Sequence, residues 1–263
     1  MGPTYEAGGP ALLERRDGAV AILTFNEPTK RNALTQAIRI TLAKAIDHAE
    51  RNPEIRAVVL TGGPQTFSSG GDLSGMEVEG LAAARERFLL LHGIVRAIVK
   101  SSKPYLAAVE GWAAGAGFSI ALCCDTIVAG NSARFIAAFP KVGLVGDAGL
   151  LHTLPARVGL GRARQILLQA RPVDAETALR IGMIDDIAPE GTAIDKALER
   201  AREFDGLAPL STALTKEYLA RGIDEVLDWE RSNQASLFMT TDHAEGKAAF
   251  ERSVRLVSVD AET

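Results

Sequence analysis

The chain has 263 residues, of which 47 % are hydrophobic and 24 % are charged, as in an ordinary globular protein. This composition excludes disordered and fibrous classes and allows one large domain or two smaller ones. The formal net charge of −4 argues against broad nucleic-acid binding, which needs a basic surface.

The two cysteines, Cys123 and Cys124, are adjacent in an apolar segment. They show neither CxxC nor metal-ligand spacing, so we expect buried, reduced thiols and no metal site. The N-terminus lacks a basic stretch followed by an apolar one, and no run approaches the ~20 apolar residues of a membrane span. We therefore expect an unprocessed, cytoplasmic protein without a membrane segment.

Strands and helices alternate through the first part of the chain. Apolar runs predict strands, and apolar residues at steps of three and four predict helices. In chain order, the expected elements are a strand at 19–25, a helix at 33–52, a strand at 56–63, a helix from 81 to 98, a strand at 104–111, a helix from near 115, strands at 125–130 and 133–137, helices at 161–171 and 174–182, and a strand at 183–189.

From about residue 192 the sequence is helical and charged, with helices expected at 193–204 and 211–222. A last helix is expected to open at Asp242, because Glu245 follows three residues later as in a capping box. Alternating strands and helices followed by helices alone predict an α/β domain and a helical layer or assembly element.

Two glycine-rich turns, FSSGGDL (67–73) and GWAAGAG (111–117), each follow an apolar strand and precede a helix. Glycine lets the backbone approach a ligand closely, with N–H groups pointing into a cavity. Two such turns that meet at one carbonyl oxygen would form an oxyanion hole. Tight packing of strand on helix would use the same glycines. A dinucleotide-binding fingerprint fits less well, because the second turn lacks GxGxxG spacing.

Several ordered motifs resemble the crotonase (enoyl-CoA hydratase/isomerase) superfamily, over residues 17 to 254. They are NEPTKRNALT, FSSGGDL, KPYLAAVEGWAAGAGFSIALCCDTIVA and FPKVGLVGDAG…LPARVGLGRARQILL…DAETALRIGMID. The resemblance implies an α/β fold, a spiral of ββα units over residues 1–191. It also implies a C-terminal helical region over residues 192–263 that packs in homotrimers, often paired into hexamers.

The same resemblance implies an acyl-CoA thioester as substrate, with no cofactor beyond the coenzyme A that the substrate carries. Its carbonyl oxygen would be held by the backbone N–H groups of Gly71 and Ala116. Lys30 and Arg31 lie where the family places basic contacts to the CoA nucleotide, although a solvated loop would also explain both charges. Further candidate contacts to the CoA and acyl groups are Ala33, Ser69, Phe139 and His92.

The type of reaction depends on where the acids lie. Hydratases of the family use two glutamates, and the matching positions here are Ser119 and Phe139. Adding water needs one group to activate the water and another to handle the proton, so hydration is disfavoured. Asp147 matches a third position, which holds a catalytic aspartate in phenylacetate-pathway-type enoyl-CoA isomerases and in 4-chlorobenzoyl-CoA dehalogenase. The context looks closest to the isomerases, in which one carboxylate suffices for a 1,3-proton shift.

Apolar neighbours such as Leu144 and Val145 are expected to raise the pKa of Asp147 and strengthen it as a base. Several alternatives stay open. Asp147 could attack the substrate as a nucleophile, with His92 activating water, or it could be a loop aspartate or helix N-cap. The protein could also be a hydratase with atypical acids, a thioesterase-type enzyme or a catalytically silent acyl-CoA-binding scaffold.

Overall fold

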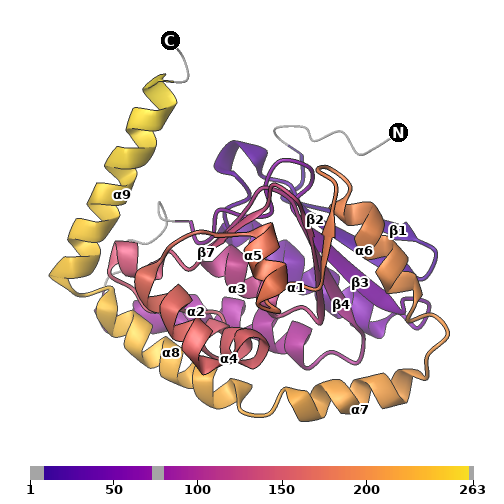
Figure 1. Cartoon of the computed structure of the whole chain (residues 1–263). Helices are drawn as coiled ribbons and strands as arrows, with labels where there is room; N and C mark the ends of the chain where they lie inside the picture. Colours follow the sequence, from indigo (N-terminus) through magenta and orange to yellow (C-terminus); the bar gives the residue numbers. More distant parts are fainter. Residues whose placement is uncertain (1–8, 73–79, 261–263) are drawn as a thin grey trace.

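Two β-sheets form the centre of this computed structural model, which describes residues 9–72 and 80–260, with side chains as far as residue 252 (Figure 1). The last residue of the predicted turn at 67–73 lies outside the described part. The larger sheet has the order β1-β2-β3-β4-β6-β9, and the smaller one the order β5-β7-β8. The strands are β1 (Leu12–Asp17), β2 (Val20–Phe25), β3 (Ala57–Thr61), β4 (Tyr105–Val109), β5 (Trp112–Ala114), β6 (Thr126–Gly130), β7 (Arg134–Ile136), β8 (Val173–Asp174) and β9 (Asp186–Ala188).

The larger sheet is buried on both faces because its inner strands are continuous apolar runs. Every residue of β3 is buried, with Val58 and Leu60 in one core and Ala57 and Val59 in the other. The pairs β2·β3, β3·β4, β4·β6 and β6·β9 are parallel, as expected for strands joined by helical crossovers, and β1 pairs antiparallel with β2.

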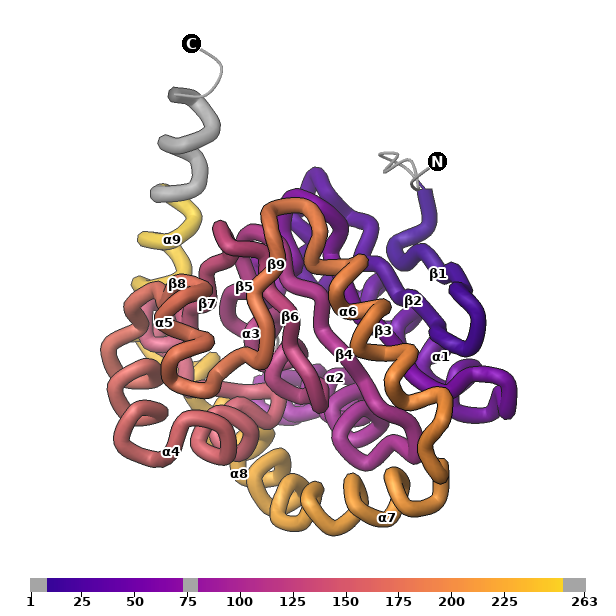
Figure 2. The backbone as a smooth tube through the Cα atoms, turned by 45° about the vertical axis from the view of Figure 1, so that its right-hand side comes forward, coloured from indigo at the N-terminus to yellow at the C-terminus, as the bar shows by residue number. Residues whose placement is uncertain are grey.

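Helices cover the two faces of this sheet unequally. The helices are α1 (Gln36–Arg51), α2 (Gly80–Val99), α3 (Ala116–Leu122), α4 (Leu150–Gln169), α5 (Ala175–Arg180), α6 (Ala193–Arg202), α7 (Pro209–Leu219), α8 (Ile223–Leu237) and α9 (Thr241–Asp260). On one face, α6 packs on β2, β3, β4, β6 and β9 through Ala193, Ala197, Leu198 and Ala201. The larger core, on the other face, packs against α1, α2, α3 and α4 (Figure 2).

The C-terminal helices wrap the body and then leave it. Helices α7 and α8 run along the outside of the molecule, α8 packs on α2, and α9 projects away from the body (Figure 1). The first turns of α9 pack on the 3-10 helix η3 (Phe139–Val142), where a Cβ on Gly246 would lie 2.8 Å from Val142 Cα. The α/β class and the helical C-terminal region are therefore as predicted, and the division at residue 191 stays a prediction.

Three local expectations need correction. The segment before residue 18 contains β1, which its charged residues Glu14, Arg15 and Arg16 concealed because an edge strand leaves them exposed. The helix α8 was not predicted as a separate element. The last helix is capped by the hydroxyl of Thr240, which accepts from the His243 N–H at 3.3 Å, so Asp242 lies in its first turn and is not the cap.

Candidate active site

The two glycine-rich turns lie side by side. The segment that begins at Ser68 runs parallel to β5, because the Ser68 N–H donates to the Trp112 carbonyl at 3.0 Å and the Ala114 N–H donates to the Ser68 carbonyl at 2.9 Å. On its other side, the Leu34 N–H donates to the Gly70 carbonyl at 2.7 Å. Backbone pairing therefore brings together two turns that are about forty residues apart in the sequence.

Gly70 and Gly115 permit this close approach. Gly70 has φ +101°, and a Cβ there would lie 2.6 Å from the Ala114 carbonyl oxygen, while Gly115 has φ +50°. The turns leave two backbone donors free: within the described residues, neither the Gly71 N–H nor the Ala116 N–H has an acceptor. The two predicted oxyanion-hole donors thus belong to adjoining backbone segments and are both unpaired.

The basic loop before α1 borders the Gly71 turn. The Asn32 carbonyl accepts from the Ser68 hydroxyl at 2.7 Å, and the Ser69 N–H donates to the Arg31 carbonyl at 2.9 Å. Lys30, Arg31 and Ser69 are exposed, whereas Ala33 is buried. Lys30, Arg31 and Ser69 are therefore exposed beside a predicted oxyanion donor.

Asp147 lies in a tight turn between η3 and α4, and its side chain is 7 % exposed. Two left-handed residues follow it, Ala148 (φ 55°) and Gly149 (φ 79°). A left-handed alanine costs roughly 1–2 kcal/mol, so surrounding contacts must hold this turn. One of them joins the Cys123 thiol to the Ala148 carbonyl oxygen, 3.6 Å away.

Burial raises the pKa of Asp147 to about 6, against the lowering effects of a Gln234 hydrogen bond and of Arg87 and Arg39. Asp72, next to Gly71, and Asp147 both act on these two arginines. Asp147 and the Gly71 turn therefore lie within electrostatic reach of the same two cations. A carboxylate with a pKa near 6 is still mostly ionised at neutral pH, and it is a stronger base than an exposed aspartate.

Helix α8 supplies two side chains that fix the Asp147 turn, and sequence reasoning missed both. The Gln234 amide donates to Asp147 Oδ2 at 3.1 Å, and Glu230 Oε2 accepts from the Gly149 N–H at 3.0 Å. The two residues are four apart on one helix face, which was the only available signal. They lie more than eighty residues beyond Asp147 in the chain, so no local pattern could assign them to it.

His92 packs against Glu230 instead of Asp147. Its Nε2 atom lies 3.8 Å from Glu230 Oε2, and the His92 and Glu230 side chains are 2 % and 0 % exposed. Burial lowers the pKa of His92 to about 4 and raises the pKa of Glu230 to about 8. At neutral pH this is a contact between two uncharged groups. The prediction that His92 contacts the substrate stays a prediction.

The two positions that carry glutamates in hydratases hold no acid. Ser119 is fully buried in α3, where its hydroxyl donates to the Gly115 carbonyl at 3.3 Å. Phe139 is buried at the start of η3, and its carbonyl accepts from the Leu144 N–H at 3.0 Å. In the described part of the chain, no cluster of three or more His, Cys, Asp or Glu residues could hold a metal ion. No described helix is long and apolar enough to span a membrane.

Comparison with known proteins identifies the family of this chain. The family model described as "Enoyl-CoA hydratase/isomerase" matches residues 15–254. The chain belongs to this family. It is 32 % identical to a short-chain-enoyl-CoA hydratase of Clostridium acetobutylicum, over 91 % of this chain and 94 % of the relative. It is 33 % identical to the 1,2-epoxyphenylacetyl-CoA isomerase of Escherichia coli, over 91 % and 94 %.

Solved structures show the same fold. An enoyl-CoA hydratase from Mycobacterium avium subsp. paratuberculosis superimposes with a TM-score of 0.83 at 30 % identity, over 92 % of this chain and 96 % of that one. The predicted crotonase fold is thereby confirmed. The protein is an enzyme of the enoyl-CoA hydratase/isomerase family, whose substrates are CoA thioesters. The named relatives include both hydratases and an isomerase, so the reaction must be argued from the site.

Proposed function

We propose that the protein is an enoyl-CoA isomerase that moves a double bond by a proton shift through Asp147. The observation that carries this proposal is the buried Asp147 carboxylate, whose Oδ1 has no hydrogen-bond partner among the described residues, together with Ser119 and Phe139 at the two hydratase acid positions. A 1,3-proton shift needs one group to take and return a proton, whereas hydration needs two acids in contact with substrate.

In the proposed reaction, the Asp147 carboxylate takes a proton from the α-carbon of a 3-enoyl-CoA. The C–H electron pair moves into the conjugated system and forms a dienolate, whose oxygen accepts from the N–H groups of Gly71 and Ala116. The protonated Asp147 then delivers a proton to the γ-carbon, or a deuteron where its carboxyl group has exchanged with deuterated solvent, and the electrons flow back to form the 2-enoyl-CoA. Atoms and electrons balance without a co-reactant.

The remaining predicted contacts would bind the ends of the substrate. Lys30 and Arg31, with Ser69 and Ala33 beside them, would contact the CoA moiety, since exposed cations attract its phosphates. Phe139, on the loop that leads to Asp147, would contact the acyl group. These assignments follow the family resemblance and the placement of the loop beside the Gly71 turn.

Two rival reactions fit the side chains less well. Nucleophilic chemistry would need His92 to activate water near Asp147, yet His92 is buried against Glu230. Atypical hydration would need a second acid at the substrate. Glu230, a buried acid on α8, has no exposed surface and already binds the Gly149 N–H.

The deciding experiment incubates the purified protein with 3-enoyl-, 2-enoyl- and 4-chlorobenzoyl-CoA in deuterated water. We expect isomerisation of the 3-enoyl substrate with carbon–deuterium exchange. Asp147→Asn should reduce both at least a hundredfold, because a positioned general base contributes ~10²–10⁴ in rate. Rapid hydration that survives Asp147→Asn would refute the proposal. Chloride release would support the nucleophilic reaction, and thioester binding without any turnover would indicate a catalytically silent acyl-CoA-binding scaffold.

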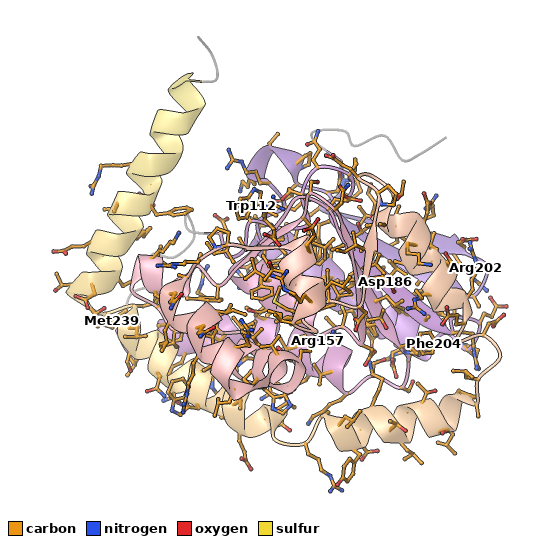
Figure 3. All side chains as sticks on the ribbon, in the orientation of Figure 1. Trp112, Arg157, Asp186, Arg202, Phe204 and Met239 are labelled. Atoms are coloured by element: carbon orange, nitrogen blue, oxygen red, sulfur yellow. The ribbon has the colours of Figure 1, made fainter. Side chains whose placement is uncertain are left out.

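Self-association as a homotrimer or hexamer would cover an apolar surface of the C-terminal region. Leu210, Leu214 and Tyr218 are exposed at steps of four along α7, and Met239 is exposed where α8 meets α9 (Figure 3). Apolar side chains aligned on one helix face usually mark an interface. Light scattering on the purified protein should give a mass of three or six chains, and a monomer would refute this assembly.

A further inference from the structure

Gln234 is the side chain that ties α8 to the Asp147 turn. Its Nε2 donates to the Val145 carbonyl at 2.9 Å and to Asp147 Oδ2 at 3.1 Å, and its Oε1 accepts from the Val145 N–H at 3.0 Å. These contacts fix the amide orientation. If the amide were flipped, its oxygen would face the Val145 carbonyl and Asp147 Oδ2, and its NH₂ group would face the Val145 N–H. Both N–H donors of a fully buried amide are therefore directed at this turn.

This contact makes the two oxygens of Asp147 unequal. Oδ2 accepts from Gln234, whereas Oδ1 is buried and has no hydrogen-bond partner in the described part of the chain. A buried carboxylate oxygen without a partner is costly unless a ligand or water meets it. Oδ1 is thus the oxygen left to exchange a proton, and Gln234 determines which oxygen that is.

The other charged groups around Asp147 act at longer range. Arg39 of α1 and Arg87 of α2 lower the pKa of Asp147, and the charge of Asp147 in turn helps to raise the pKa of Glu230 in α8. Arg39 is bound to the carbonyls of Thr35 and Arg87 at 3.4 and 3.5 Å. Within the described residues, Gln234 supplies the one hydrogen bond that the Asp147 carboxylate receives.

We propose that Gln234 is a positioning residue of the proton shift, which holds Oδ2 of Asp147 so that Oδ1 carries the proton between the two carbons. This inference rests on the proposed isomerase function and deepens it. A general base contributes fully only when the reacting oxygen is held in reach of the proton, and a misplacement of about 1 Å costs up to 10²-fold in rate.

A second anchor allows this role to be separated from loop folding. Glu230, one helical turn before Gln234, holds the Gly149 N–H independently. Gln234→Met removes the donor to Asp147 and leaves that anchor in place. Glu230→Gln is the matched control, because it keeps an acceptor for Gly149 and leaves the Gln234 contacts intact. Gln234→Glu is a second test variant, which keeps the acceptor for Val145 and replaces the donor by an oxygen.

The test measures kcat, KM and the pH profile of isomerisation, with the Asp147 carboxyl titrated by ¹³C NMR in the absence of substrate. Gln234→Met should lower kcat about tenfold to a hundredfold with KM nearly unchanged. The Asp147 pKa should rise, because a hydrogen bond to the ionised carboxylate lowers it. The acid limb of the rate profile should therefore move to higher pH in both Gln234 variants and stay in place in Glu230→Gln.

If Gln234 only held the turn in place, the pKa of Asp147 would shift in the opposite direction in the Gln234 variants. Release of the turn would expose Asp147 to water, so its pKa would fall toward the ordinary 3.8. Such a fall, or a wild-type kcat in Gln234→Met beside an inactive Asp147→Asn, would overturn this inference alone. Full activity of Asp147→Asn would overturn the proposed function as well.

Discussion

The two proposed oxyanion turns and the Asp147 turn are built differently. Gly71 and Ala116 offer main-chain donors, held by pairing between segments 68–71 and 112–116. Asp147 offers a side chain, held by Gln234 and Glu230 from a helix more than eighty residues away. A change of side chain would therefore leave these main-chain donors in place. The base depends on side chains that local sequence does not reveal.

Because of this difference, substitutions in the two regions should lower activity in different ways. Changes in the oxyanion turns should act through the presence or absence of an N–H group. Changes around Asp147 should act through its pKa and orientation, and so through pH. The predictions below test each side of that comparison.

The largest effect is expected for Ala116→Pro. Ala116 is the first residue of α3, a position where proline is tolerated, and within the described chain its N–H bonds to no acceptor. Proline removes the donor, so kcat should fall about 10²–10³-fold, the usual cost of losing one oxyanion donor. Steady-state kinetics with a 3-enoyl-CoA measures this loss.

Ala116→Gly is the matched control for that variant. It keeps the N–H and should retain activity within a few-fold, and circular dichroism should show both variants folded. Equal losses in the two variants would mean that the side chain, and not the donor, matters at this position. The comparison between main-chain and side-chain construction would then fail.

A smaller effect is expected for Glu230→Gln, measured as a change in how the free energy of unfolding depends on pH. Burial raises the pKa of Glu230 from 4.5 to about 8, so between these values the folded protein keeps a proton that the unfolded chain has released. The free energy of unfolding should therefore fall as pH rises through this window, by at most about 1.4 kcal/mol per pH unit. Glu230→Gln should flatten that decline.

The window from pH 6.5 to 8 isolates this effect. Asp147 titrates between 3.8 and about 6, where the unfolding free energy also falls with rising pH. The pKa of His92 is lowered from 6.5 to about 4, so between these values His92 makes the unfolding free energy rise with pH. Urea unfolding of both proteins at several pH values within the window measures the slope. An unchanged slope in Glu230→Gln would show that Glu230 is ionised in the folded state.

The sequence by itself determined much of the fold and the backbone half of the site. Continuous apolar runs such as 57–61 favour strands buried on both faces, and the two turns with Gly70 and Gly115 need glycine for steric reasons. Their order along the chain was enough to indicate the family. Asp147 was a candidate because its position matches that of a catalytic aspartate in the isomerases that the chain resembles.

Only the tertiary structure decided how Asp147 is held and which groups surround it. Packing of α8 on α2 brings Glu230 and Gln234 to the turn and sets His92 against Glu230. The charged strand β1 likewise forms because it pairs with β2, and the Thr240 cap of α9 is seen only in the hydrogen bond from the His243 N–H. The physical reason is that hydrogen bonds and burial depend on distance in space, whereas periodicity and turn chemistry report only residues close in the chain.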